Sequence, residues 1–296
     1  MLIDANTLRV LDTFVVRTRR SFFGIRQGAH RSPRRGHGIE FAEYRQYEAG
    51  DNPRYIDWNL YARSDKLYIK RYLEEENVSV FIIIDASRSL THPDLRAKWD
   101  LASYITAFAS YIALTSQDPV AISILGGPSS PIFWGGKAFS SVTRFINDAT
   151  SKIVQDTAIQ LDLSEEARRA ATRVRFPGVC LIISDFLYPL EQVSQVLGHL
   201  QARNMEVHAI QVLGQADIDP QPGSLGSTCT DSETGERLGL ALDPASRKKY
   251  AQLLEGHNKG VREYCLQHQI KFVSSVAEGP LAERGIETLT EMSLFV

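Results

Sequence analysis

Apolar and polar positions alternate along the chain in patterns that predict both buried strands and amphipathic helices. Three runs of branched apolar residues are typical of strands buried on both faces: 78–84, 179–184 and 207–213. Three longer segments carry apolar residues at helical spacing: 95–115, 190–203 and 245–269. The alternation predicts an α/β fold, with a mostly parallel, doubly wound sheet and helices on both of its faces.

Shorter segments complete the alternation. Further strands are predicted at 120–125, 132–134 and 270–273, which gives a sheet of about six strands. Further helices are predicted at 7–20, 139–151, 165–173 and 281–292. The stretch 214–244 is irregular and contains the turn sequence SETG, so we expect a hairpin insertion there.

Polar side chains stand where two of the buried strands end. Asp85, Ser87 and Ser89 alternate directly after the first run, and Asp185 follows the run at 179–184. Ligands of open parallel sheets bind at the carboxyl ends of the strands, so these oxygens can converge if the two strands are neighbours. Oxygen ligands without nearby His or Cys suit a hard divalent cation, Mg²⁺ or Mn²⁺.

Composition narrows the possible partners. The 296 residues carry a formal net charge of −2, which gives no general reason to expect nucleic acid. Residues 1–39 hold eight Arg and two acids, and we interpret them as a basic arm lying on the acidic remainder of the chain. Three widely spaced cysteines, no secretory signal and no long apolar segment predict a cytoplasmic protein without stable membrane insertion.

Other interpretations of the same residues stay open. Asp85 with two serines is also compatible with a simple turn and helix cap. A phosphatase that starts from a strand-end Asp needs a second acid two residues later, where this chain has Ser87; the pair Asp217 and Asp219 has that spacing but follows another strand. A scaffold with a degenerate metal site is the third alternative. P-loop, GxSxG and HExxH sequences are absent.

The segment Asp85-Ala86-Ser87-Arg88-Ser89 resembles the DxSxS signature of the metal-ion-dependent adhesion site in von Willebrand factor A domains. The resemblance implies that both serines and a threonine, for which Thr157 is our candidate, hold the metal. It implies that Asp85 and Asp185 act directly or through water, and that an acidic side chain of a partner fills the open position. Thr150 and Ser164 are alternatives to Thr157.

Upstream of this segment stand Glu43-Tyr44-Arg45-Gln46-Tyr47, Gly50-Asp51, Arg54, Ile56-Asp57-Trp58 and Ala62-Arg63. This motif resembles the bacterial family catalogued as domain of unknown function 58, and the likeness extends over about 36–276. Its members are associated with MoxR-type AAA+ ATPases, so the resemblance implies a non-enzymatic adaptor or co-chaperone for such an ATPase. The motif residues that also form a possible partner surface are Arg45, Gly50, Asp51, Arg54, Asp57, Trp58 and Arg63. From the residues themselves we expect a turn with positive φ at Gly50, and a charge network of Arg54, Asp57 and Arg63 anchored by Trp58.

These inferences divide the chain into three parts. We expect a basic amino-terminal helix and loop over 1–38, a β-rich extension over 39–77, and a von Willebrand factor A-like domain over 78–296 that carries the hairpin of 214–244. No catalytic residue and no organic cofactor are predicted.

Overall fold

A computed structural model describes most of the chain, in two compact units. The described residues are 3–16, 40–73, 78–91, 96–153, 162–173, 178–203, 205–220, 229–230, 237–238 and 244–295. The larger unit holds residues 3–16 and those from 78 onward, and the smaller unit holds 40–73. The helix of the first predicted part, 1–38, belongs to the unit that contains the sheet.

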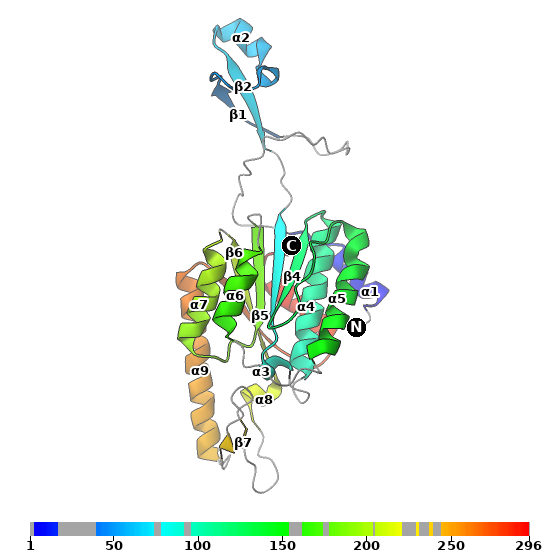
Figure 1. The fold of residues 1–296 in the computed structure, drawn as a ribbon, viewed down its shortest axis with the longest axis vertical. Helices are drawn as coiled ribbons and strands as arrows, with labels where there is room; N and C mark the ends of the chain where they lie inside the picture. Colours follow the sequence, from blue (N-terminus) through cyan, green and yellow to red (C-terminus); the bar gives the residue numbers. More distant parts are fainter. Residues whose placement is uncertain are drawn as a thin grey trace. The chain divides into compact units, whose positions relative to one another are not determined.

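A five-stranded sheet forms the centre of the larger unit (Figure 1). Its strands are β3 (Ser79–Asp85), β4 (Val120–Leu125), β5 (Gly178–Ser184), β6 (Glu206–Leu213) and β9 (Lys271–Val276). They lie in the order β4-β3-β5-β6-β9, and each neighbouring pair is parallel. The predicted α/β fold with a parallel sheet is confirmed, but the prediction of about six strands is wrong by one.

The segment predicted as a sixth strand, 132–134, makes only an isolated antiparallel bridge. Phe133 pairs with Val120 at the outer edge of β4, and a second bridge joins Ser129 to Ser123. Pro131 lies between these two bridges and has no backbone N–H to donate, so a continuous ladder cannot form there.

Alternate residues of the strands face two separate cores. On β3, Val80, Ile82 and Ile84 belong to one core, and Phe81 and Ile83 belong to the other. The first core is covered by α1 (Ala5–Leu11), α4 (Arg96–Thr115), α5 (Phe139–Ile153) and α10 (Leu281–Glu291). The second is covered by α6 (Leu163–Thr172), α7 (Leu190–Gln201) and α9 (Pro244–Gln267). This arrangement explains why the inner strands β3 and β5 have no polar face.

β5 begins very close to β3. Gly178 pairs with Ser79, and a Cβ atom on Gly178 would lie 2.1 Å from the carbonyl oxygen of Ser79. A side chain at this position would therefore push the two strands apart, so glycine sets how closely β5 approaches β3.

Two predicted boundaries need correction or refinement. The first helix covers only Ala5–Leu11, because the chain turns after it and Val16 forms an antiparallel bridge with Phe295; residues 17–20 of the prediction lie outside the described residues. Within 214–244 a short helix, α8 (Gln215–Ile218), precedes an antiparallel pair of β7 (Cys229–Thr230) and β8 (Arg237–Leu238), in agreement with the predicted hairpin.

The smaller unit is a two-stranded antiparallel sheet whose connection carries short helices. β1 (Glu40–Gln46) pairs with β2 (Tyr68–Leu73), and between them lie the 3-10 helix η1 (Pro53–Tyr55) and α2 (Trp58–Ser64). Gly50 has φ of 114°, as its turn sequence predicts. Over the described part of the chain, no helix is both long enough and apolar enough to cross a membrane.

The start of β3 depends on a buried carboxylate, which makes the stability of the fold sensitive to pH. Asp118 is buried and accepts a hydrogen bond from the backbone N–H of Val78 at 2.7 Å. Burial raises the pKa of Asp118 to about 6, and the hydrogen bond from Val78 opposes this rise.

We expect Asp118→Asn to change how stability depends on pH. Because the folded-state pKa lies above the ordinary value of 3.8, ionisation of Asp118 opposes folding, and this penalty grows as pH rises from about 4 to 6. The amide keeps the oxygen that Val78 needs and cannot ionise. Denaturant unfolding at pH 4 and pH 7 should therefore show the variant gaining about 1–3 kcal/mol over the wild type between the two. Parallel stability curves would contradict this assignment.

Candidate functional site

The carboxyl ends of β3 and β5 lie side by side and carry the predicted acidic residues. β3 ends at Asp85, β5 ends at Ser184, and Ile84 pairs with Ile183, so the two ends are level. The chain runs from β3 to β4 on one side and then returns to β5 on the other side of β3. This reversal is a topological switch point, which is the usual ligand-binding position of a doubly wound sheet.

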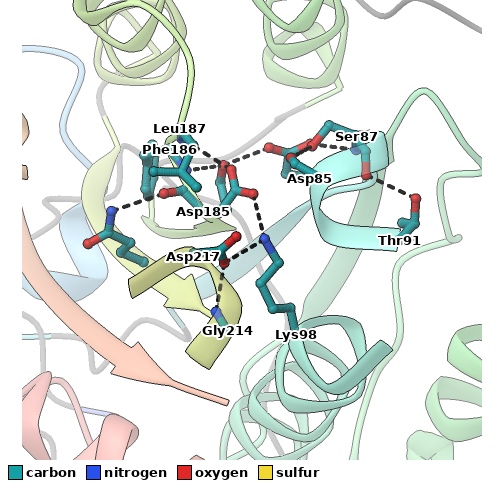
Figure 2. A network of polar contacts seen from close by, with 12 residues as sticks. Asp85, Ser87, Thr91, Lys98, Asp185, Phe186, Leu187, Gly214 and Asp217 are labelled. Carbon is teal, nitrogen blue, oxygen red and sulfur yellow. Dashed lines mark hydrogen bonds and ion pairs between the residues drawn. The ribbon is translucent and has the colours of Figure 1, made fainter. Parts of the chain in front are cut away.

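Asp85 is fully enclosed and bonded through both of its carboxylate oxygens (Figure 2). Oδ1 accepts a hydrogen bond from the backbone N–H of Ser87 at 2.8 Å, and Oδ2 accepts one from the hydroxyl of Ser184 at 2.6 Å. Ser184 Oγ in turn accepts from the backbone N–H of Phe186 at 2.9 Å. Ser184 therefore joins the two strand ends directly.

The two predicted serines lie together in the loop after β3. Their hydroxyl oxygens, Ser87 Oγ and Ser89 Oγ, are 3.0 Å apart. A short helix, α3 (Arg88–Thr91), holds this loop, and Thr91 closes it by donating from its hydroxyl to the carbonyl oxygen of Ser87 at 2.9 Å. The two hydroxyls are hydrogen-bonded to each other, and they are neutral oxygen donors of the kind that a hard cation such as Mg²⁺ accepts.

Asp185 is held on the opposite side of the site. Its Oδ1 accepts from the backbone N–H of Leu187 at 3.1 Å, and its carbonyl oxygen accepts from the side-chain amide of Gln211 at 3.0 Å. The following residue, Phe186, has a left-handed φ of 53°, and His257 Nε2 lies 2.7 Å from its carbonyl oxygen. Contacts from β6 and α9 thus fix the turn that aims Asp185.

A buried lysine that the sequence analysis missed lies against Asp185 (Figure 2). Lys98 Nζ is 3.0 Å from Asp185 Oδ2 and 2.9 Å from Asp217 Oδ2, and the lysine side chain has no exposed surface. Asp217 also accepts from the backbone N–H of Gly214 at 2.7 Å. A signal was present in the sequence, because Lys98 falls on the apolar face of its helix with Ala102.

The carboxylates repel one another in this enclosed setting. Burial, and then the charge of Asp185, raise the pKa of Asp85 to about 6, while hydrogen bonds from Ser184 and Ser87 oppose the rise. The described network contains three carboxylates, Asp85, Asp185 and Asp217, and one ammonium group, Lys98. Two negative charges remain when all these groups are ionised.

The predicted ligands divide into those brought together and those that are not described. Asp85, Ser87, Ser89 and Asp185 share the site, whereas Thr157 lies outside the described residues. The alternatives to Thr157 have other contacts: Thr150 Oγ1 accepts from the Trp99 indole at 2.9 Å, and Ser164 Oγ lies 3.3 Å from His199 Nε2. Within the described ranges, no group of three or more His, Cys, Asp or Glu residues forms a metal-binding cluster.

The pair considered for phosphatase chemistry has structural contacts instead. Asp217 is bonded to Lys98 and to the backbone of Gly214, and Asp219 forms an ion pair with Arg247. Both aspartates are therefore engaged in polar contacts of their own.

The upstream motif forms polar contacts within the smaller unit. Arg45 binds Asp51 at 2.6 Å, and Asp51 also accepts from the backbone N–H of Glu48. Asp57 accepts from the first N–H groups of α2 and from the Tyr44 hydroxyl at 2.9 Å. The expected role of Trp58 as an apolar anchor is wrong, because its side chain is 60% exposed and touches Tyr61 edge-on. Arg54 and Arg63 are exposed as well.

Comparisons with known proteins confirm the family resemblance that the upstream motif indicated. The sequence model of the family described as "Protein of unknown function DUF58" matches residues 43–260. Two relatives, "Uncharacterized protein Mb1516" of Mycobacterium bovis and "Uncharacterized protein Rv1480" of Mycobacterium tuberculosis, are each 27% identical, over 87% of this chain and 81% of theirs.

Solved structures show a more distant likeness. The conserved hypothetical protein BatB from Bacteroides thetaiotaomicron has a TM-score of 0.44 and 15% identity, over 73% of this chain and 99% of that chain. The pilus adhesin SpaC from Lactobacillus rhamnosus GG has a TM-score of 0.41 and 11% identity, over 75% of this chain and 31% of that chain.

We expect Ser184→Ala to destabilise the protein by about 1–3 kcal/mol, because it removes a buried hydrogen bond to Asp85 and leaves the Phe186 N–H without its acceptor. Thermal or denaturant unfolding at pH 7 measures the loss. Ser151→Ala, which removes an exposed hydroxyl on α5, is the matched control and should change stability by less than about 0.5 kcal/mol. Equal effects of the two substitutions would contradict the bridging role of Ser184.

Proposed function

Since the chain belongs to the family described as protein of unknown function DUF58, we propose that it is a metal-dependent protein-interaction module and not an enzyme. It has a von Willebrand factor A-like fold, and it binds Mg²⁺ or Mn²⁺ between the ends of β3 and β5. The metal grips an acidic side chain of a protein partner. The observation that carries this proposal is the convergence of Asp85, Ser87, Ser89 and Asp185 at the switch point of the sheet.

The oxygen atoms of the proposed ligands favour a hard cation, and such a cation still attracts an anion when it is bound by neutral ligands. Ser87 and Ser89, whose hydroxyl oxygens lie 3.0 Å apart, would hold the metal through neutral oxygen ligands. A divalent cation with neutral ligands retains most of its charge and therefore supplies strong attraction for a carboxylate. Thr157 remains the proposed third hydroxyl ligand.

Asp85 and Asp185 suit a role through bound water. Each of the two oxygens of Asp85 already accepts a hydrogen bond from Ser87 or Ser184, and those of Asp185 accept from Leu187 and Lys98. Oxygens engaged in this way can accept a further hydrogen bond from a water ligand, and so orient it. In this role the two aspartates supply negative charge near the metal through water and leave a position for a carboxylate of the partner.

Hydrolysis is the less supported alternative. A phosphatase mechanism needs an acid–base residue close to the strand-end Asp, and Ser87 occupies that place in the sequence. Asp217 is engaged by Lys98 and Gly214. Among the described residues, the acid that such a phosphatase carries two residues after its strand-end Asp is therefore replaced by Ser87, whereas hydroxyls and carboxylates that suit a bound cation are present.

The partner is proposed from the family resemblance. Association of the family with MoxR-type AAA+ ATPases makes such an ATPase the expected partner, with this chain as its adaptor or co-chaperone in the cytoplasm. The partner would present a Glu or Asp to the metal, and the exposed motif residues Arg54, Trp58 and Arg63 are a possible second contact.

We expect Ser87→Ala to lower the affinity for Mn²⁺ by at least about tenfold while the protein stays folded, because one direct ligand is lost. Titration calorimetry with Mn²⁺ on the full chain measures the affinity, and thermal unfolding checks the fold. Ser140→Ala, an exposed serine on α5, is the control and should bind Mn²⁺ as the wild type does.

The same variants test the partner. In a pull-down from native lysate, an AAA+ ATPase should be retained by the wild type with Mg²⁺ and lost with EDTA or with Ser87→Ala. Retention that ignores both changes would support a scaffold with a degenerate site. Turnover of phosphoester substrates by the wild type would instead support the hydrolase.

A further inference from the structure

The ammonium group of Lys98 is enclosed next to the candidate metal ligands (Figure 2). It extends from the first turn of α4 and contacts Asp185 Oδ2 at 3.0 Å and Asp217 Oδ2 at 2.9 Å. Of the lysines and arginines in the described part of the chain, Lys98 alone forms an ion pair with either aspartate. A buried lysine needs such partners, since an uncompensated charge in the core is strongly unfavourable.

This arrangement is unusual for a site that attracts cations. The carboxylate of Asp185 would balance the charge of a metal held by Ser87 and Ser89, yet it already shares its charge with Lys98. An ammonium group in direct contact with that carboxylate also repels a cation nearby, and little water is present to screen the repulsion. Lys98 therefore opposes the binding of a metal alone.

We propose that Lys98 lowers the affinity of the site for a divalent cation, so that the cation binds tightly only together with an anionic ligand. This inference rests on the proposed function and deepens it. Lys98 partly neutralises Asp185, and a carboxylate from the partner replaces the negative charge that the metal would otherwise lack. Metal and acidic partner then bind cooperatively, and the site stays largely without metal until the partner arrives.

Two substitutions in the same contact should act in opposite directions. Lys98→Met removes the positive charge, and we expect Mn²⁺ to bind at least about tenfold more tightly. Asp217→Asn leaves Lys98 with Asp185 as its remaining carboxylate, so its charge acts more fully on the site and Mn²⁺ should bind more weakly. Titration calorimetry with Mn²⁺ on the full chain at pH 8 measures the affinities of the wild type and the two variants and so ranks them. A purely structural Lys98 predicts weaker binding in both variants, and that result would overturn the inference.

The double variant Lys98→Met/Asp217→Asn covers the case in which Lys98→Met does not fold. It removes one positive and one negative charge, so the network keeps the net charge of the wild type. Position 217 then holds no unpaired carboxylate, and the charge of Asp185 is no longer shared with an ammonium group. We expect it to bind Mn²⁺ more tightly than the wild type. Weaker or equal binding by this folded variant would also count against the role of Lys98.

A small dicarboxylate supplies a second readout that folding does not affect. Glutarate should tighten Mn²⁺ binding by the wild type more than it tightens binding by the folded Lys98 variant, because the cation in the variant is already better neutralised. Equal tightening would overturn the cooperative role. Absence of Mn²⁺ binding by the wild type, with and without glutarate, would overturn the proposed function itself, whereas binding with the wrong order of variants overturns only the role of Lys98.

Discussion

The parallel pairing of β3 with β5 is the constraint on which the larger unit depends. It makes the two strand ends level, so Asp85 and Ser184 meet and the turn after Ser184 brings Asp185 to the same place. Gly178 allows the strands to approach closely at their other end. Since the chain reverses its direction of winding between these strands, the connections that leave their carboxyl ends run in opposite directions, and polar side chains can gather there.

Concentrating carboxylates at this point has an electrostatic cost, and the surrounding residues reduce it. Asp85 is surrounded by hydrogen-bond donors, and its pKa nevertheless rises to about 6 because burial and Asp185 dominate. Lys98 partly neutralises Asp185 and forms a second ion pair with Asp217. The network is thus partly neutralised from within, which is compatible with folding before any cation is bound.

The sequence predicts much of this fold because strand burial and helical spacing are local patterns. Asp85 and Asp185 could be placed together because each follows a run of branched apolar residues. Lys98 was missed because apolar periodicity identifies a helix face without showing which charge a core position tolerates. The same limit explains Trp58, whose size suggests a core although its side chain is 60% exposed. The segment 132–134 has strand character, but a proline beside it prevents a ladder.

The smaller unit shows why the family motif consists largely of polar and glycine residues. Among its described side chains, Ile69 is the only buried apolar one, so burial alone cannot specify its shape. A two-stranded sheet of this kind is marginally stable without other support. The support visible here is local: Asp51 fixes the turn through Arg45, and Asp57 caps α2 while it accepts from Tyr44. Replacing these polar residues would remove the contacts that define the unit.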